Sequence, residues 1–334
     1  MPVISVGDMS QQFISMRNSG AIKSELSELA ESLSSGRVTD VTRTLNGDTV
    51  RLSGINYSLV QMEGYQQSIT ETTQTLIGIQ AILGQVDTMR ADTAEQLLLV
   101  SDESTISQVD EAARAARDTF SEMVTVLNTQ IADRSLMSGT RVDSPALANP
   151  EDMLADMITA IGGATTPAAI SAAITTWFND PAGGFATMGY LGDTGAVAQR
   201  RVSETNTVDL DARADDPAIR ETLKFAAVAA MANDLTGLDR TTKATLLQDA
   251  GTGLFTASSE LIGVRARIGS AEAEVAQSET EMNAQKTSLE IAKNNLVSAD
   301  PFDTASRLQS VQLQLETHYS VTARLSQLSL LRYI

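Results

Sequence analysis

Few residues in this sequence have the chemistry of a catalytic or metal site. His318 is the single histidine, and cysteine is absent, so a transition-metal site lacks its usual ligands. A lone histidine can act as a general base. His318, however, stands three residues after Leu315 in a predicted terminal helix, and we interpret it as a polar interface residue. We predict that the protein is not an enzyme and binds no metal or cofactor.

Two other groups of residues have a weak chemical signature. Asp209, Asp211, Asp215 and Asp216 offer oxygen ligands for a hard cation such as Ca²⁺, but this segment lacks the Gly and the terminal Glu of an EF-hand loop. A solvated turn between a strand and a helix is the simpler interpretation. The segment 251–253, Gly-Thr-Gly, is too short for a phosphate-binding loop and falls within a helical pattern.

Composition favours long helices and excludes several classes of partner. Apolar residues make up 42% of the 334 residues, aromatic residues only 4%, and there are 12 Met, a mixture that suits packed helices better than a β-sandwich. The net charge of −18, from 42 acidic and 24 basic residues, argues against nucleic acid and anionic membranes as partners. We find no apolar run long enough for a signal peptide or a membrane span.

The first third of the chain has helical periodicity in three stretches. The first stretch ends at 34–36, Ser-Ser-Gly, where glycine is a plausible terminator. The second runs from about residue 49 to a break at 101–105, and the third, with unbroken three-four spacing, from 106 to 131. The first stretch supplies an expected assembly face, with four apolar residues on one side: Ile22, Leu26, Leu29 and Leu33.

The clearest pattern is a three-four alternation between residues 247 and 296, which predicts one rod helix about 75 Å long with a coiled-coil seam. Four glycines would weaken this helix locally, so either packing against partner helices compensates or the helix starts later: Gly251, Gly253, Gly263 and Gly269. The seam residues are Leu254, Leu261, Val264, Ile268, Val275, Met282, Leu289 and Leu296.

Pro301 ends this pattern, and a last helix is predicted from about 303 to 332. Its apolar residues spread over more than one stripe, so this helix needs a partner. The expected assembly residues are Leu308, Val311, Leu315, Leu325 and Leu328.

The middle of the chain, 141–215, is richer in Gly and Pro. A short helix is expected around Trp177-Phe178, either as a core anchor or as a contact to a neighbouring subunit, and two short strands are expected after it. We predict a mainly α fold: a long antiparallel coiled-coil rod formed by both chain ends, with a small α+β insertion. The expected domains are 1–45 and 300–334 (inner assembly helices), 46–140 and 216–299 (rod), and 141–215 (variable outer domain).

Three segments resemble the flagellin family. Residues 261–331 resemble the C-terminal region of flagellins and flagellin-like hook-associated proteins, with an Arg-x-x-(Ile/Leu)-Gly element at 265–269 and an Ala-Asp turn at 299–300. The segment 33–38, LSSGRV, resembles the Leu-Ser-Ser-Gly of flagellins, but the Asp-Asp-Ala-Ala-Gly that usually follows is missing. Residues 133–148, DRSLMSGTRVDSPALA, look like the phrase that leads into the variable domain in hook–filament junction members.

The resemblance implies a structural subunit of the bacterial flagellum, an adaptor at the hook–filament junction whose chain ends pair as a coiled coil and fold on assembly. It further implies other copies of the chain, flagellin, the other junction protein and an export chaperone as partners. Export would pass through the flagellar type III apparatus without a cleaved signal, to an extracellular position on the flagellum. A filament flagellin proper, or another type III secreted helical bundle, remains the alternative.

Overall fold

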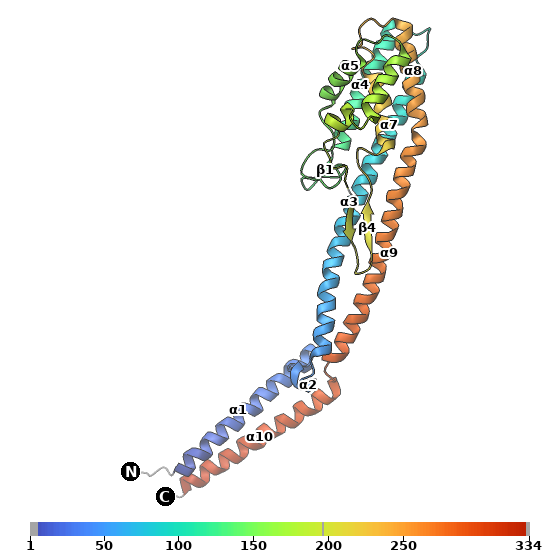
Figure 1. Cartoon of the computed structure of the whole chain (residues 1–334). Helices are drawn as coiled ribbons and strands as arrows, with labels where there is room; N and C mark the ends of the chain where they lie inside the picture. The colour runs from blue at the N-terminus through green and yellow to red at the C-terminus, as the bar shows by residue number, and fades with distance from the viewer. Residues whose placement is uncertain (1–5, 196, 332–334) are drawn as a thin grey trace. The chain divides into compact units, whose positions relative to one another are not determined.

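The computed structural model describes residues 6–195 and 197–331, apart from the side chains of residues 6–8, 11 and 325–331. Its contacts divide the chain into a terminal unit, Met1–Met62 with Asn283–Ile334, and a central unit, Glu63–Met282. Long helices dominate both units, and the strands of the described residues form two antiparallel two-stranded sheets (Figure 1). The predicted fold class, a mainly α-helical rod with a small α+β part, is confirmed. None of the described helices is long and apolar enough to cross a membrane.

The terminal unit is built from helices at both chain ends. It contains α1 (Val6–Ser35), α2 (Val41–Thr44) and α10 (Pro301–Leu331), the first part of α3 (Val50–Leu98) and the last part of α9 (Ser258–Val297). Helix α1 is 30 residues long, much longer than the amphipathic stretch that the sequence indicated. Its apolar residues do not keep to one stripe, so periodicity located only its second half.

In the central unit, α3 and α9 run antiparallel and side by side. The Gln80 side-chain amide donates to the Arg265 carbonyl (2.8 Å), and Gln66 donates to Glu279 (3.4 Å). Side chains of both helices are buried between these polar links, for example Leu76 on α3 and Val275 on α9. These contacts form the antiparallel rod that the seam predicted.

The remaining helices of the central unit form a bundle in which α4 packs on α7, α7 packs on α8, and α5 and α6 pack on each other (Figure 1). Their bounds are α4 Ile106–Leu127, α5 Pro150–Ile161, α6 Pro167–Asn179, α7 Pro217–Ala230 and α8 Arg240–Thr256.

Three of these helices begin with a side-chain N-cap followed by proline. Asn149, Thr166 and Asp216 each accept a hydrogen bond from the first turn through their side chains, and proline follows each of them. Proline is tolerated at the first helical position because the amide it lacks has no partner there. Helix α5 was not expected from the sequence, although this cap-proline pair marks its start.

Helix α4 ends earlier than predicted. Thr105 and Gln108 form a capping box at its start, but the helix stops at Leu127 and not at 131. A hairpin follows, with β1 (Gln130–Ile131) and β2 (Arg134–Ser135) joined by two residues of positive φ, 50° and 60°. The spacing of Ile131 therefore matched the helix by chance, because the turn takes the chain out of the helical path.

The middle segment packs around an aromatic cluster. Trp177 and Phe178 are buried, as the core interpretation predicted. Phe178 stacks on Phe185 (5.2 Å between centroids), which stacks on Tyr190 (6.3 Å), and the Trp177 indole donates to Asp156 (2.7 Å). Phe185 opens the short π-helix η1 (Phe185–Gly189). The predicted strands are β3 (Ala198–Arg201) and β4 (Thr207–Leu210), which pair antiparallel.

The pattern across 247–296 forms two helices, α8 and α9, which divide at Ala257, so the long rod helix starts at Ser258, the later start that the glycines left open. Ala257 has ψ of −14°, well away from the helical value of about −42°. The Thr256 hydroxyl donates to the Gly253 carbonyl (2.9 Å), which competes with the backbone at the helix end. Leu254 and Leu261 are both fully buried, so the seam continues across the break.

The two glycines of α8 allow other groups to approach closely. A Cβ on Gly251 would lie 3.0 Å from the Leu97 Cβ and 3.3 Å from the Ala94 carbonyl, both on α3. A Cβ on Gly253 would meet the ring of Phe225 on α7. The sequence indicated a helix weakened by glycine, whereas the packing gives the reason for glycine at both positions.

We expect Gly253→Ala to destabilise the central unit by about 1–3 kcal/mol, because the clash with Phe225 outweighs the better helix propensity of alanine. Gly263 in α9 is exposed, and nothing lies within 4 Å of its would-be Cβ. The matched change Gly263→Ala is expected to stabilise by up to about 1 kcal/mol. Chemical denaturation checks both values, and equal shifts in the same direction would contradict this account.

Candidate assembly surface

The terminal helix pair, defined as α1 and α10, runs antiparallel and brings the described chain ends together (Figure 1). Near these ends, the Ser15 hydroxyl lies 3.4 Å from His318 Nε2. Further along, the Lys23 ammonium lies over the Tyr319 ring, 5.7 Å from its centroid. Its hydrogen bond to the hydroxyl lowers the pKa of Tyr319 below the ordinary value.

Two sequence motifs meet at the other end of the pair. Gly36 has φ of +69°, a left-handed conformation that favours glycine and ends α1. Its carbonyl accepts from the Ala299 amide (3.0 Å), and the Val38 amide donates to the Val297 carbonyl (2.9 Å). The LSSGRV segment and the Ala-Asp turn, more than 250 residues apart in sequence, therefore form one antiparallel bridge.

Helix α10 starts directly after this bridge. The Asp300 carboxylate accepts from the amides of Phe302 (2.8 Å) and Asp303 (3.2 Å), which caps the helix. Pro301 takes the first helical position, so α10 begins two residues before the predicted start. Proline stops a helix that precedes it, but it fits the first turn of the next one.

The terminal unit buries little apolar surface for its length. Its buried apolar side chains, among the described residues, are Ile22, Ile55, Val297 and Val311. Helices α1 and α10 have 30 and 31 residues, and helices of this kind depend on packing for most of their stability. The pair is thus poorly stabilised by its own contacts.

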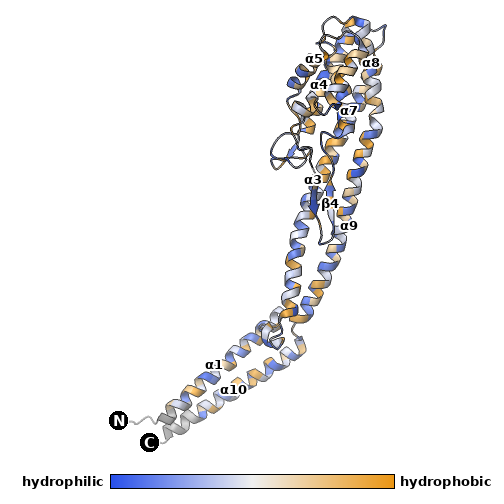
Figure 2. Ribbon diagram, in the orientation of Figure 1, coloured by the Kyte–Doolittle hydropathy of each residue, from blue (hydrophilic) through white to orange (hydrophobic). Residues whose placement is uncertain are grey.

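Large apolar side chains remain exposed on this unit, at fractions from 39% to 83%. Figure 2 shows that hydrophobic residues recur along both α1 and α10. We interpret this number of exposed large apolar side chains as a candidate interaction surface. The exposed residues are Met9, Phe13, Ile14, Met16, Leu33, Val50, Tyr57, Val60, Ile291, Phe302, Leu313, Tyr319 and Val321.

The residues expected to form the assembly faces differ in how deeply they are buried. Ile22 and Val311 are buried; Leu26, Leu29, Leu308 and Leu315 are half-buried. Leu33 is exposed, because Ser32 takes the buried position at that end of α1 and its hydroxyl bonds to Thr39 (2.9 Å). The side chains of Leu325 and Leu328 lie outside the described residues.

The predicted seam residues lie on the inner side of the rod. Among them, Leu289 and Leu296, which belong to the terminal unit, are half-buried. The seam residues of the central unit are buried: Leu254, Leu261, Val264, Ile268, Val275 and Met282.

The acidic group at 209–216 has arginine partners. Arg267 on α9 pairs with Asp216 (2.5 Å) and Asp211 (3.5 Å), and Arg213 lies 3.3 Å from Asp215. Burial raises the pKa of Asp215 above its usual range. Within the described part of the chain, no three His, Asp or Glu side chains come together in a way that could hold a metal ion.

Sequence reasoning missed a polar link at the junction of three helices. Arg90 on α3 is only 5% exposed and pairs with Asp87 (2.8 Å). It also donates to the carbonyl of Leu254 in α8 (2.8 Å), and Arg265 of α9 approaches the same Asp87 (3.7 Å). The sequence shows only an Asp followed three residues later by an Arg in a helix with many apolar residues. This spacing suggests an ion pair but does not indicate that the pair is buried.

Comparison with known proteins agrees with this architecture. Residues 253–334 match the family model of the bacterial flagellin C-terminal helical region. The fold is similar to that of a Vibrio parahaemolyticus protein assigned as a flagellar hook-associated protein, with a TM-score of 0.53, 11% identity, and coverage of 74% of this chain and 96% of that one. It is also similar to that of Bacillus cereus FlgL, with a TM-score of 0.52, 12% identity, and coverage of 72% and 99%. A sequence comparison with curated proteins finds no match.

Proposed function

We propose that this chain is a structural subunit of the bacterial flagellum that assembles through its terminal helix pair. The observation that carries the proposal is the exposed apolar surface of α1 and α10, together with the few side chains that the terminal unit buries. Helices with this imbalance gain stability by packing against other copies or other subunits. The flagellin C-terminal match over residues 253–334 supports a flagellar setting, and this role requires no catalytic residues.

We further propose a position at the hook–filament junction, like that of hook-associated protein 3. The support is the segment 133–148 and the sequence after Gly36, which departs from that of flagellins. In this proposal the inner domains are 1–45 and 300–334, the rod is 46–140 with 216–299, and 141–215 is the variable outer domain. The partners are other copies, flagellin, the second junction protein and an export chaperone. The subunit would reach the cell exterior by the type III route.

Deletion of the gene tests the junction role. We expect cells that retain hooks but lack filaments, seen by electron microscopy, with flagellin monomers in the culture medium. Re-expression of the full chain is the control and should restore filaments.

Intact filaments with no flagellin in the medium would overturn the junction role. Loss of the filament itself, without secreted flagellin, would instead indicate the filament flagellin.

A further inference from the structure

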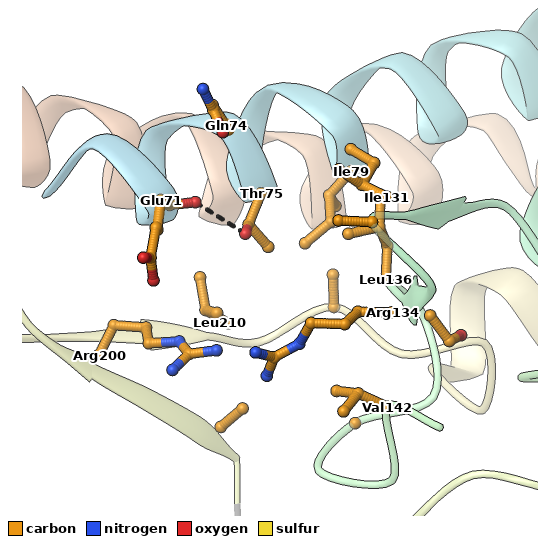
Figure 3. Close-up of a pocket in the computed structure, with 15 residues that line it drawn as sticks. Glu71, Gln74, Thr75, Ile79, Ile131, Arg134, Leu136, Val142, Arg200 and Leu210 are labelled. Atoms are coloured by element: carbon orange, nitrogen blue, oxygen red, sulfur yellow. Dashed lines mark hydrogen bonds between the residues drawn. The ribbon is translucent and has the colours of Figure 1, made fainter. Parts of the chain in front are cut away.

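A pocket of about 330 Å³ lies in the central unit between α3 and the two hairpins, β1–β2 and β3–β4 (Figure 3). Its wall is largely apolar, formed by Ile79 of α3, Leu136 and Val142 beside the first hairpin, and Leu210 of the second. All of its lining residues belong to the central unit.

The first hairpin reaches α3 because position 78 is glycine. A Cβ on Gly78 would lie 2.8 Å from the terminal methyl groups of both Ile131 and Leu136. The turn residues Ala132 and Asp133 are held at positive φ, a conformation that aspartate tolerates but that is unfavourable for alanine. The packing over Gly78 holds the hairpin, and with it Arg134, beside the pocket.

Two arginines line the pocket, and Glu71, the one acidic residue of its wall, forms no ion pair with either of them. Figure 3 shows the guanidinium groups of Arg134 and Arg200 pointing toward each other. Among the described residues, neither side chain has a hydrogen bond or ion pair, and Arg201 next to Arg200 has none either. Every other Lys and Arg side chain of the central unit makes such a contact.

This arrangement is unfavourable without an anion. Two facing positive charges repel each other, and the repulsion grows as water is removed from between them. A carboxylate between the two guanidinium groups would reverse the sign of the interaction and can accept hydrogen bonds from both. The chain itself is rich in carboxylates, with 42 acidic residues against 24 basic ones.

A second surface of the central unit combines exposed apolar side chains with glutamates, whose charge is opposite to that of the pocket arginines. A groove where α3 ends and α8 meets α9 exposes Leu98 (46%), Leu99 (78%), Phe255 (67%) and Ile262 (55%). Glu95 lines this groove, and so does Arg90, whose charge is paired with Asp87. We define the acidic apolar patch as these four apolar residues with Glu95 and with Glu260, which stands two residues before Ile262 on α9. Both glutamates are exposed, and neither forms an ion pair within the described residues.

A copy cannot fill its own pocket with this patch. Thr75 of the pocket and Glu95 of the patch lie on the same continuous helix, α3, twenty residues apart, which corresponds to about 30 Å at 1.5 Å per residue. Contact between the two surfaces therefore requires two molecules.

We propose that the acidic apolar patch of one copy docks on the hairpin pocket of a second copy, with Glu95 and Glu260 facing Arg134 and Arg200. The inference rests on the proposed self-assembly and names a contact of the central unit for it. The two surfaces differ, so the contact is head-to-tail and each copy keeps one free surface of each kind. Such a contact generates a ring or an open helical array.

Charge reversal tests the docking. Arg134→Glu and Arg200→Glu, each made in the full chain, are expected to weaken self-association by roughly tenfold or more in sedimentation velocity. Arg114→Glu is the matched control, because Arg114 is exposed on the same unit and pairs locally with Glu111 (2.7 Å). It changes the net charge equally and should leave association unchanged. The fourfold swap Arg134→Glu/Arg200→Glu/Glu95→Arg/Glu260→Arg should restore association.

Cross-linking gives a second test, which a misfolded variant cannot mimic. The chain has no cysteine, so Gln74→Cys in the pocket and Ser259→Cys in the patch each introduce a single thiol. With a mild oxidant such as oxidised glutathione, a mixture of these two variants should form a disulfide-linked dimer, whereas Gln74→Cys mixed with Thr125→Cys on α4 should not.

The outcomes separate the two proposals. Wild-type association that neither arginine reversal weakens, with no Gln74–Ser259 cross-link, would overturn the docking while self-assembly stands. Failure of the wild-type chain to associate at any concentration, or to enter flagella in cells, would overturn the proposed function itself.

Discussion

Deletion of residues 301–334 is expected to abolish assembly while the central unit stays folded. The deletion removes α10, and α1 then loses the helix that covers Ile22. The central unit, Glu63–Met282, has its own core of fully buried side chains, among them Leu83, Phe120 and Leu247. Circular dichroism should show a loss of helix limited to the terminal pair, and thermal unfolding of the remainder should stay cooperative.

Assembly of this truncated chain is measured by sedimentation velocity and by its incorporation into flagella. The single change Leu315→Asp, which puts a charge at a half-buried position of α10, is expected to have the same effect on incorporation without unfolding the rod. The control is Gln312→Asp at an exposed position of the same helix. Helix loss throughout the molecule, or normal incorporation of Leu315→Asp, would contradict the role of the terminal pair.

Replacement of Arg90 by leucine is expected to cost the central unit about 1–3 kcal/mol of unfolding free energy, because two hydrogen-bond acceptors lose their donor. Asp87 would keep Arg265 alone at 3.7 Å. The Leu254 carbonyl, close to the end of α8, would lose the donor that lies 2.8 Å away. An unpaired polar group of this kind is costly when it is buried.

Arg114→Leu is the matched comparison for this change. Arg114 and Glu111 form a pair with the same three-residue spacing, but both side chains are more than 60% exposed. Such a pair contributes about 0–1 kcal/mol, so its removal should shift the midpoint of urea unfolding only slightly. Equal losses in the two variants would show that the link between α3 and α8 adds nothing to stability.

The sequence by itself determined the helical class and much of the organisation. The three-four spacing of Leu261, Val264 and Ile268 predicted the buried side of α9, and the apolar residues of α10 indicated a helix in need of a partner. Such patterns are local, because a residue's neighbours on a helix face are fixed by the helical repeat alone. The same reasoning predicted the two strands of the second hairpin, since alternation is also a local signal.

Only the tertiary structure decided which segments meet. The bridge between Gly36 and Ala299, the closeness of Gly253 to Phe225, and the two unpaired arginines at the hairpin pocket all join residues that are distant in sequence. Periodicity carries no information on such pairs. Periodicity also gave a wrong helix end at Ile131, where a turn follows the helix. An apolar residue can be buried in a hairpin as well as in a helix, so its spacing alone does not distinguish the two. The burial of Arg90 also depends on segments distant in sequence. Its side chain is charged, and only the packing of α8 and α9 against α3 removes it from water.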